Sequence, residues 1–313
     1  MTLKRLQNRI AESRLTLPIT ALYGILMWTA EGLFTNNRWL QFVLFVISTY
    51  LLIELNNKNA LIRTYSRMVS CSFIVMTLAS FGLSESVGGN ILQLCVIAFY
   101  TLLFNCYQDR KSAGFTFYAF IFIGIASLVF VQTLFFVPFL WIIMMFNIQS
   151  LSIRTFCASI LGLIVPYWGL GFYYFIEGNI QDMGNHFIEL TQFGTFAQFM
   201  NISTGKILTF VYVATIALIG SIHFIRNSYK DKIRIRMLFN LFITMDLLSA
   251  IFIILQPQHY DFLIRMMIIN TCPLIGHYIT LTKTWITNIS VYIIIISSVL
   301  LTILNIWLPS FNF

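Results

Sequence analysis

A carboxylate lies near the centre of one of the most apolar stretches of this chain. The stretch is LFNLFITMDLLSAIFIIL, residues 238–255, and Asp246 is the one charged residue in it. A helix rises 1.5 Å per residue, so Asp246 would lie about 13 Å from the end at which this helix begins. A charged carboxylate at that depth in a bilayer costs several kcal/mol unless it is paired, hydrated or protonated. Asp246 is therefore a candidate proton or ion relay, or else a neutral group that fixes helix packing.

Two histidines are candidate partners for Asp246. His277 lies about six residues from the inner end of the next apolar segment, and His223 lies near the inner end of the preceding one. The reach of the side chains brings a pair between Asp246 and His277 within range. If this chain moves protons or ions, we expect Asp246, His277 and His223 to form the relay.

A second set of charged residues lies at the opposite ends of the apolar segments. Glu31 ends the first segment, Arg38 precedes the second, and Arg265 begins the tenth at the same level as Glu31. A guanidinium matches the geometry of a phosphate group. We expect Glu31 and Arg265 to line one outward pocket if the first and tenth helices approach each other, with Glu31 as a base and the arginines binding phosphate.

Residues 176–205 form the one long connection on that side. Asp182, His186 and Glu189 are spaced i, i+4 and i+7, which puts them on one face if the segment is helical. A solvated helix face has the same pattern, so the spacing does not predict a metal site.

The stretch QPQHYDFLIR adds more polar groups to the same side. It contains His259, Asp261 and Arg265, and Asp261 is spaced to pair with Arg265 across one helical turn. We expect His259, Asp261 and His186 to bind substrate beside the arginines.

The composition predicts the elements that must position these residues. Charged residues make up 10% of the chain, hydrophobic residues 58%, and the mean hydropathy is +0.84. That leaves too little polar surface to coat a water-soluble domain. Apolar runs of about 17 to 23 residues match the length of a helix that crosses a bilayer. The sequence predicts an all-α, polytopic bundle that forms a single integral membrane domain over residues 1–313.

Eleven spans are predicted. We expect residues 114–149 to form a short helical hairpin, because Gln132 and Thr133 interrupt the apolar run and Pro138 weakens helix continuity. One long tilted helix is the alternative. The predicted spans are 15–34, 39–55, 67–84, 90–106, 114–131, 133–149, 155–175, 206–225, 237–256, 264–282 and 287–309.

The basic residues predict the orientation of these spans. With the N-terminus in the cytoplasm, only Arg38, Lys206 and Arg265 of the 19 lysines and arginines fall outside. Cytoplasmic loops of membrane proteins carry such an excess. Merging the hairpin into one span would put the RNSYKDKIRIR run outside. We therefore expect a cytoplasmic N-terminus and an outer C-terminus in a bacterial inner membrane.

Several classes of function are excluded by what the chain lacks. The net charge of +8 is scattered over the loops, which argues against a nucleic-acid partner. The five cysteines show no CxxC spacing, so neither a zinc site nor a disulfide framework is indicated. The chain has no GxxxxGK[ST] loop, so it does not drive transport with ATP by itself. No cofactor is predicted.

Four stretches carry a resemblance to a known group of proteins. The chain resembles an uncharacterised family of polytopic inner-membrane proteins of Bacteroidota, which implies the same membrane fold but no particular activity. The stretches are LLIELNNKNALIRTYSR, FIFIGIASLVFVQTLFFVPFLW, RTFCASILGLIVPYWG and TCPLIGHYI.

The layout also resembles polytopic glycosyltransferases and polysaccharide polymerases that take sugars from polyprenyl phosphate carriers. A short hairpin after several spans, followed by a long outer loop, carries this looser resemblance. It implies a polyprenyl-phosphate-linked substrate, with Glu31 at the place of an acid near the first outer loop. In those families that loop is long and rich in acids, whereas here TNNR joins the first two spans.

Three functions follow as hypotheses. The first is an enzyme that processes a glycan or lipid-linked sugar of the cell envelope at the outer face. The second is a proton-coupled transporter or flippase that uses Asp246, and the third is a noncatalytic subunit of an envelope membrane assembly. The predicted partners are the lipid bilayer and a polyprenyl-phosphate-linked substrate, and no protein partner is indicated. A cavity over Glu31 would favour the enzyme, and a cavity around Asp246 the transporter.

Overall fold

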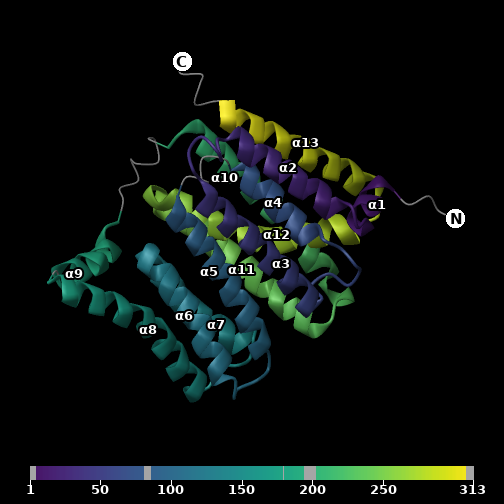
Figure 1. Cartoon of the computed structure of the whole chain (residues 1–313). Helices are drawn as coiled ribbons and strands as arrows, with labels where there is room; N and C mark the ends of the chain where they lie inside the picture. The colour runs from purple at the N-terminus through teal and green to yellow at the C-terminus, as the bar shows by residue number, and fades with distance from the viewer. Residues whose placement is uncertain (1–4, 81–85, 179, 194–201, 308–313) are drawn as a thin grey trace.

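The described part of the chain is a bundle of helices. The computed structural model describes residues 5–80, 86–178, 180–193 and 202–307, and Figure 1 shows the helices packed side by side. Within these ranges the chain forms no strand. The predicted all-α fold class is confirmed.

The helices follow one another with short connections. The α-helices are α1 (Leu6–Glu12), α2 (Thr16–Ala30), α3 (Trp39–Asn59), α4 (Met68–Ala79), α5 (Val87–Leu103), α6 (Ala113–Val129), α7 (Val137–Phe146), α8 (Ile153–Glu177), α9 (Ile180–Ile188), α10 (Thr204–Asn227), α11 (Ile233–Leu255), α12 (Tyr260–Leu281) and α13 (Trp285–Trp307). Short 3₁₀ helices are η1 (Phe104–Cys106), η2 (Val131–Phe136), η3 (Glu189–Thr191), η5 (Ser228–Lys230) and η6 (Pro257–His259).

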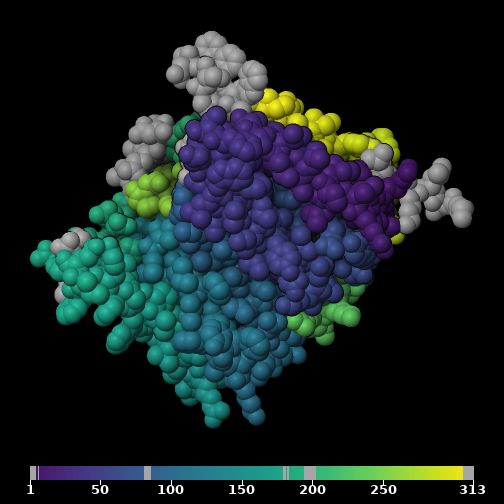
Figure 2. Space-filling model, in the orientation of Figure 1, coloured from purple at the N-terminus to yellow at the C-terminus, as the bar shows by residue number. Residues whose placement is uncertain are grey.

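Seven helical stretches among the described residues are long and apolar enough to cross a membrane. They are Trp39–Asn59, Val87–Cys106, Ile153–Glu177, Thr204–Lys230, Ile233–Leu255, Pro257–Leu281 and Trp285–Asn305. Shorter apolar helices are Thr16–Ala30, Met68–Ala79, Ala113–Val129 and Val131–Phe146. Large apolar side chains are exposed on the outward faces of α2, α3, α8 and α13, and Figure 2 shows α2 and α3 over the upper part of one face of the bundle. The chain is a multi-pass membrane protein, because such faces are stable only against lipid.

The segment over residues 114–149 is divided into two helices. α6 ends at Val129, Phe130 has an extended backbone, and the 3₁₀ helix η2 leads into α7. Gln132 and Thr133 lie in η2, and Pro138 lies in the first turn of α7. Backbone N–H groups in the first turn of a helix have no acceptor within the helix, so a proline is tolerated there. One continuous helix is therefore wrong for this segment.

Helix α12 lies at the centre of the bundle. Almost every side chain in it is buried, and it packs against α4, α5, α10 and α11, between the elements shown in Figure 1. Small residues bring these helices close together: a Cβ on Gly276 would lie 3.0 Å from the backbone nitrogen of Val69 on α4, and one on Gly220 of α10 would lie 2.9 Å from Leu274. Close backbone approach of this kind is how helices gain packing energy in lipid.

Candidate functional site

The guanidinium of Arg265 is buried where α12 begins. The residue is 1% exposed, and its Nη1 donates a hydrogen bond of 3.0 Å to Oδ1 of Asn90 and one of 3.5 Å to Oε1 of Gln93. Both amides belong to α5. Since a buried charge is costly without polar partners, these amide oxygens stabilise the guanidinium and fix its direction.

A glycine on α5 makes room for this side chain. A Cβ on Gly89 would lie 2.6 Å from Nε of Arg265, which is closer than real Cβ contacts. The same turn of α5 is held by Ser86, whose hydroxyl accepts a hydrogen bond from the Gly89 N–H and whose carbonyl accepts one from the Asn90 amide. The start of α5 is therefore shaped around the Arg265 side chain.

An ion pair in the connection between α2 and α3 lies within electrostatic range of Arg265 through its Glu31 carboxylate. Glu31 follows α2, Arg38 precedes α3, and their side chains are 3.6 Å apart and each 13% exposed. The carboxylates of Glu31 and Asp261 are close enough to Arg265 to act on it electrostatically. We name Glu31, Arg38, Asn90, Gln93 and Arg265 the Arg265 cluster, and the side of the bundle where it lies the Arg265 end. Glu31 and Arg265 thus come from distant parts of the sequence to one place.

Asp261 pairs with Lys206 rather than with Arg265, the partner expected from the sequence. Its carboxylate lies 2.8 Å from Nζ of Lys206, and both side chains are nearly half exposed. Arg265 instead donates to the amides of α5, because its side chain lies on the buried face of α12 whereas the Asp261 side chain is half exposed. An exposed pair of this kind stabilises the fold by about 0 to 1 kcal/mol.

His186 packs onto the end of α6. Its Nε2 lies 3.1 Å from the carbonyl oxygen of Ser127, and its ring contacts Tyr167 and Phe187. The side chain of Asp182 lies outside the described residues, as do residues 179 and 194–201 of the long loop. Among the residues that the structure describes, no group of three histidine, cysteine or acidic side chains could hold a metal ion.

His259 joins the η2 and η6 turns. Its Nε2 lies 3.0 Å from the side-chain nitrogens of Gln132 and Gln258, and its ring packs on Phe130. Gln132 also donates a hydrogen bond to the carbonyl of Glu189. Among the described residues, the contacts of His259 are therefore with the η2 connection and those of His186 with α6 and α8, rather than with the Arg265 cluster.

Asp246 lies buried between α11 and α12. Its Oδ1 accepts a hydrogen bond of 3.0 Å from the hydroxyl of Thr271, and the residue is 5% exposed. Thr271 is six residues before His277, about 9 Å along α12. The contact partner of Asp246 is thus a hydroxyl on the neighbouring helix, which joins α11 to α12.

His277 is paired with an acid that the sequence argument passed over. Its Nε2 lies 3.0 Å from Oδ2 of Asp231, and the two side chains are only 1% and 4% exposed. Arg63 lies 3.9 Å from the other carboxylate oxygen, and the ring of His223 lies 5.5 Å from that of His277. The expected pair between Asp246 and His277 is replaced because the connection between α10 and α11 folds back onto α12. We name this side of the bundle the Asp231 end.

Three residues of these sites were missed from the sequence. Asn90 and Gln93 are polar residues three positions apart in an apolar span, a spacing that puts both on one helix face. Asp231 is the one acid in the RNSYKDKIRIR run, and its basic neighbours made the whole run look solvated. A lone acid in a basic loop that follows a histidine-bearing helix is the signal that was available.

The fold and the buried charges define a class of protein, an all-helical multi-pass membrane protein with polar sites at both ends of its central helix. Comparison with known proteins finds no matching protein family, no similar curated protein and no similar solved structure.

Proposed function

We propose that this chain acts on a phosphate-bearing, lipid-linked substrate at the Arg265 end, and that the substrate is a polyprenyl-phosphate-linked sugar of the cell envelope. The observation that carries this proposal is the burial of the Arg265 guanidinium, which is held by two amides of α5 and lies within electrostatic range of the Glu31 carboxylate. An arginine whose fork is oriented in advance by amides binds phosphate with little loss of side-chain entropy. A site of low dielectric also strengthens that interaction.

Each residue of the cluster has a role in this proposal. Arg265 and Arg38 bind the phosphate of the carrier, and Asn90 and Gln93 are positioning residues that act through Arg265. Glu31 accepts the proton of an acceptor hydroxyl as its oxygen forms a bond to the anomeric carbon of the sugar, while the bond from that carbon to the carrier phosphate breaks and the polyprenyl phosphate leaves bound to the arginines. His259, Asp261 and His186 flank the cluster and bind the polar head of the substrate.

The proposal includes eleven membrane crossings, with the N-terminus in the cytoplasm and the C-terminus outside. Only five of the seven long helices lie between Glu31 and Arg265 in the sequence, which alone would put these residues on opposite faces. If the three shorter helices between them also cross the membrane, there are eight crossings, and an even number places Glu31 and Arg265 on the same side. The proximity of Glu31 to Arg265 supports the larger number.

The Asp231 end supports the same count. Arg63 and Asp231 lie 3.9 Å apart. Three long helices lie between them in the sequence, and the three shorter ones bring the number of crossings to six. An even number again places both residues on one face. With the basic residues of the loops, this face is the cytoplasmic one in an inner membrane.

Turnover of the proposed substrate tests the function. Right-side-out vesicles that contain the chain are given a polyprenyl-phosphate-linked radiolabelled sugar, and loss of label from the lipid is measured. We expect Glu31→Gln to slow turnover by about 10² or more, as for other general bases. Glu54→Gln is the matched control, since Glu54 lies at the other end of α3 in a surface pair with Lys58. Equal turnover in both variants would remove Glu31 from the mechanism.

A second candidate is proton-coupled transport. Buried polar groups occur at three levels of α12: Arg265 with Asn90, Thr271 with Asp246, and His277 with Asp231. Arg265 and His277 are separated by about 18 Å along the helix. This column of polar groups through the bundle centre favours a relay, and Asp246 is its middle member.

A further inference from the structure

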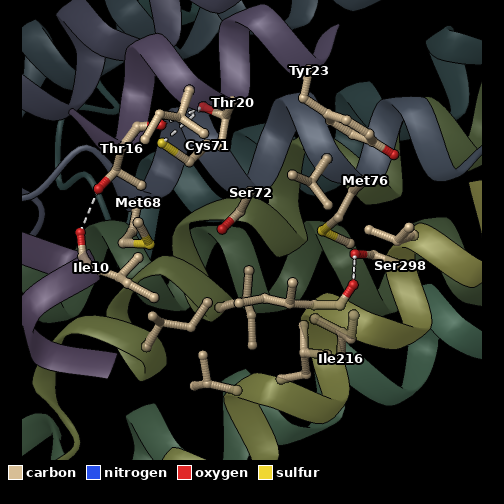
Figure 3. A pocket seen from close by; sticks show the side chains of 18 of the residues that line it. Ile10, Thr16, Thr20, Tyr23, Met68, Cys71, Ser72, Met76, Ile216 and Ser298 are labelled. Atoms are coloured by element: carbon tan, nitrogen blue, oxygen red, sulfur yellow. Dashed lines mark hydrogen bonds between the residues drawn. The ribbon is translucent and has the colours of Figure 1, made fainter. Parts of the chain in front are cut away.

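An elongated cavity lies among α1, α2, α4, α10, α12 and α13. It has a volume of about 330 Å³, and its walls are almost entirely apolar. Figure 3 shows Ile10 and Thr16 at one end, Tyr23 at the other, and Met68, Ser72 and Met76 between them. From Met68 to Met76 the wall extends about 12 Å along α4. The lining includes neither Glu31 nor Asp246.

Hydrogen bonds join neighbouring helices near both ends of the cavity. Towards the Arg265 end, the Tyr23 hydroxyl on α2 donates to Thr302 on α13. Towards the Asp231 end, the backbone N–H of Gln7 on α1 donates to Asn288, and the Gln7 amide donates to the carbonyl of Ile279. The cavity is also partly open to the surface of the bundle, which gives a ligand access from the side.

The side opening faces the hydrocarbon of the bilayer. Ile19 on α2 and Ile295 and Val299 on α13 line the cavity and are also exposed on the outer surface of the bundle. Both the rim and the walls are apolar, so in a membrane the cavity is continuous with the lipid chains rather than with water. Because its walls and rim are apolar, the cavity favours the binding of a hydrocarbon chain.

Basic side chains lie where this opening meets the Asp231 end. Arg9 on α1 and Arg14 before α2 are exposed, and Thr16, two residues after Arg14, lines the cavity. The described part of this segment also holds the exposed residues Arg5 and Glu12, so its charge is positive. Basic residues at a membrane surface attract anionic headgroups by about 1 kcal/mol each.

We propose that this cavity binds one acyl chain of an anionic glycerophospholipid, with its phosphate at Arg14 and Arg9. The lipid comes from the leaflet at the Asp231 end. None of the described residues that line the cavity belongs to the Arg265 cluster. The site is therefore separate from the proposed catalytic one.

Photo-cross-linking of the full chain in nanodiscs tests this site. The probe is phosphatidylglycerol with a diazirine in one acyl chain, diluted in phosphatidylcholine. We expect adducts on the cavity faces of α4 and α13, and at least a fivefold loss of these adducts in Ser72→Phe, which fills the cavity. Val299→Trp blocks the rim of the cavity from outside and should give the same loss of adducts. This variant keeps the test available if Ser72→Phe does not fold. Val43→Phe, on the exposed face of α3, is the control that keeps the adducts.

The headgroup is tested by competition. Unlabelled phosphatidylglycerol should remove the adducts, and unlabelled phosphatidylcholine should not. Arg14→Gln should abolish this preference for phosphatidylglycerol. Arg154→Gln, which changes an exposed arginine of α8, is the control that keeps the preference. Equal competition by both lipids would overturn the anionic headgroup. Adducts that are unchanged by both Ser72→Phe and Val299→Trp would overturn the cavity as the site.

Discussion

Arg265 on α12 and Asn90 on α5 are joined by a hydrogen bond of 3.0 Å from the guanidinium to the amide oxygen. Both residues are almost completely buried. The bond therefore connects the central helix to its neighbour and fixes the direction of the one guanidinium on which the proposed function depends.

Loss of this bond should destabilise the bundle. We expect Asn90→Ala to lower the free energy of unfolding by about 1.5 to 3 kcal/mol, the usual contribution of a hydrogen bond to a charged group. Thermal unfolding followed by fluorescence-detected size exclusion measures the change. Asn105→Ala is the matched control, since the exposed Asn105 amide bonds only within the end of α5. Identical melting of the two variants would show that the bond contributes nothing.

Asp246 should be replaceable by asparagine under the main proposal. Asparagine keeps an oxygen that accepts the Thr271 hydroxyl, so Asp246→Asn should leave both melting and sugar turnover within about twofold of the wild type. Measurement of turnover in vesicles tests this expectation. If the variant folds but loses its sugar turnover, Asp246 has a role in the reaction beyond helix packing, which contradicts this expectation.

The pairing of His277 can be measured with double-mutant cycles. Since His277 and Asp231 are in contact, the effects of His277→Gln and Asp231→Asn on unfolding should couple by about 0.5 to 3 kcal/mol. The cycle of His277→Gln with Asp246→Asn should be additive within about 0.5 kcal/mol. Coupling in the second cycle and additivity in the first would contradict the arrangement at the Asp231 end.

Cysteine labelling should place the two polar ends on opposite sides of the membrane. Cys157 is the exposed native cysteine in the structure, so Cys157→Ser provides the background. We expect Tyr229→Cys to react only with reagents that reach the cytoplasm, and Asn185→Cys to react from outside. Reaction of both from one side would contradict the eleven crossings.

The sequence predicted the elements of this fold better than their partners. Apolar length and the interruption around Gln132 and Pro138 are local signals, so the helices and the break after α6 follow from them. Glu31 and Arg265 were expected at one level from the lengths of their apolar segments, and the Glu31 carboxylate acts electrostatically on Arg265 in the structure. The shared pocket and the number of crossings between them stay predictions. Depth is a one-dimensional quantity that apolar length determines well.

The partner of His277 depended on how the helices and loops pack beside one another in the plane of the membrane, which depth alone does not determine. Asp246 was chosen for its depth, but the loop between α10 and α11 folds back and brings Asp231 to the histidine. The cavity beside Ser72 was likewise beyond prediction, because it is the space left between six helices whose relative positions no local pattern specifies.

Binding of polyprenyl phosphate to the purified chain tests the central claim most directly. Affinities for radiolabelled polyprenyl phosphate and for neutral polyprenol are compared in nanodiscs, for the wild type and for Arg265→Lys, which keeps the charge but not the planar fork. We predict that the wild type prefers the phosphate and that Arg265→Lys weakens phosphate binding about tenfold, or about 1.4 kcal/mol, with polyprenol binding unchanged. Equal affinity of the wild type for both lipids would contradict the proposal that the Arg265 cluster recognises phosphate.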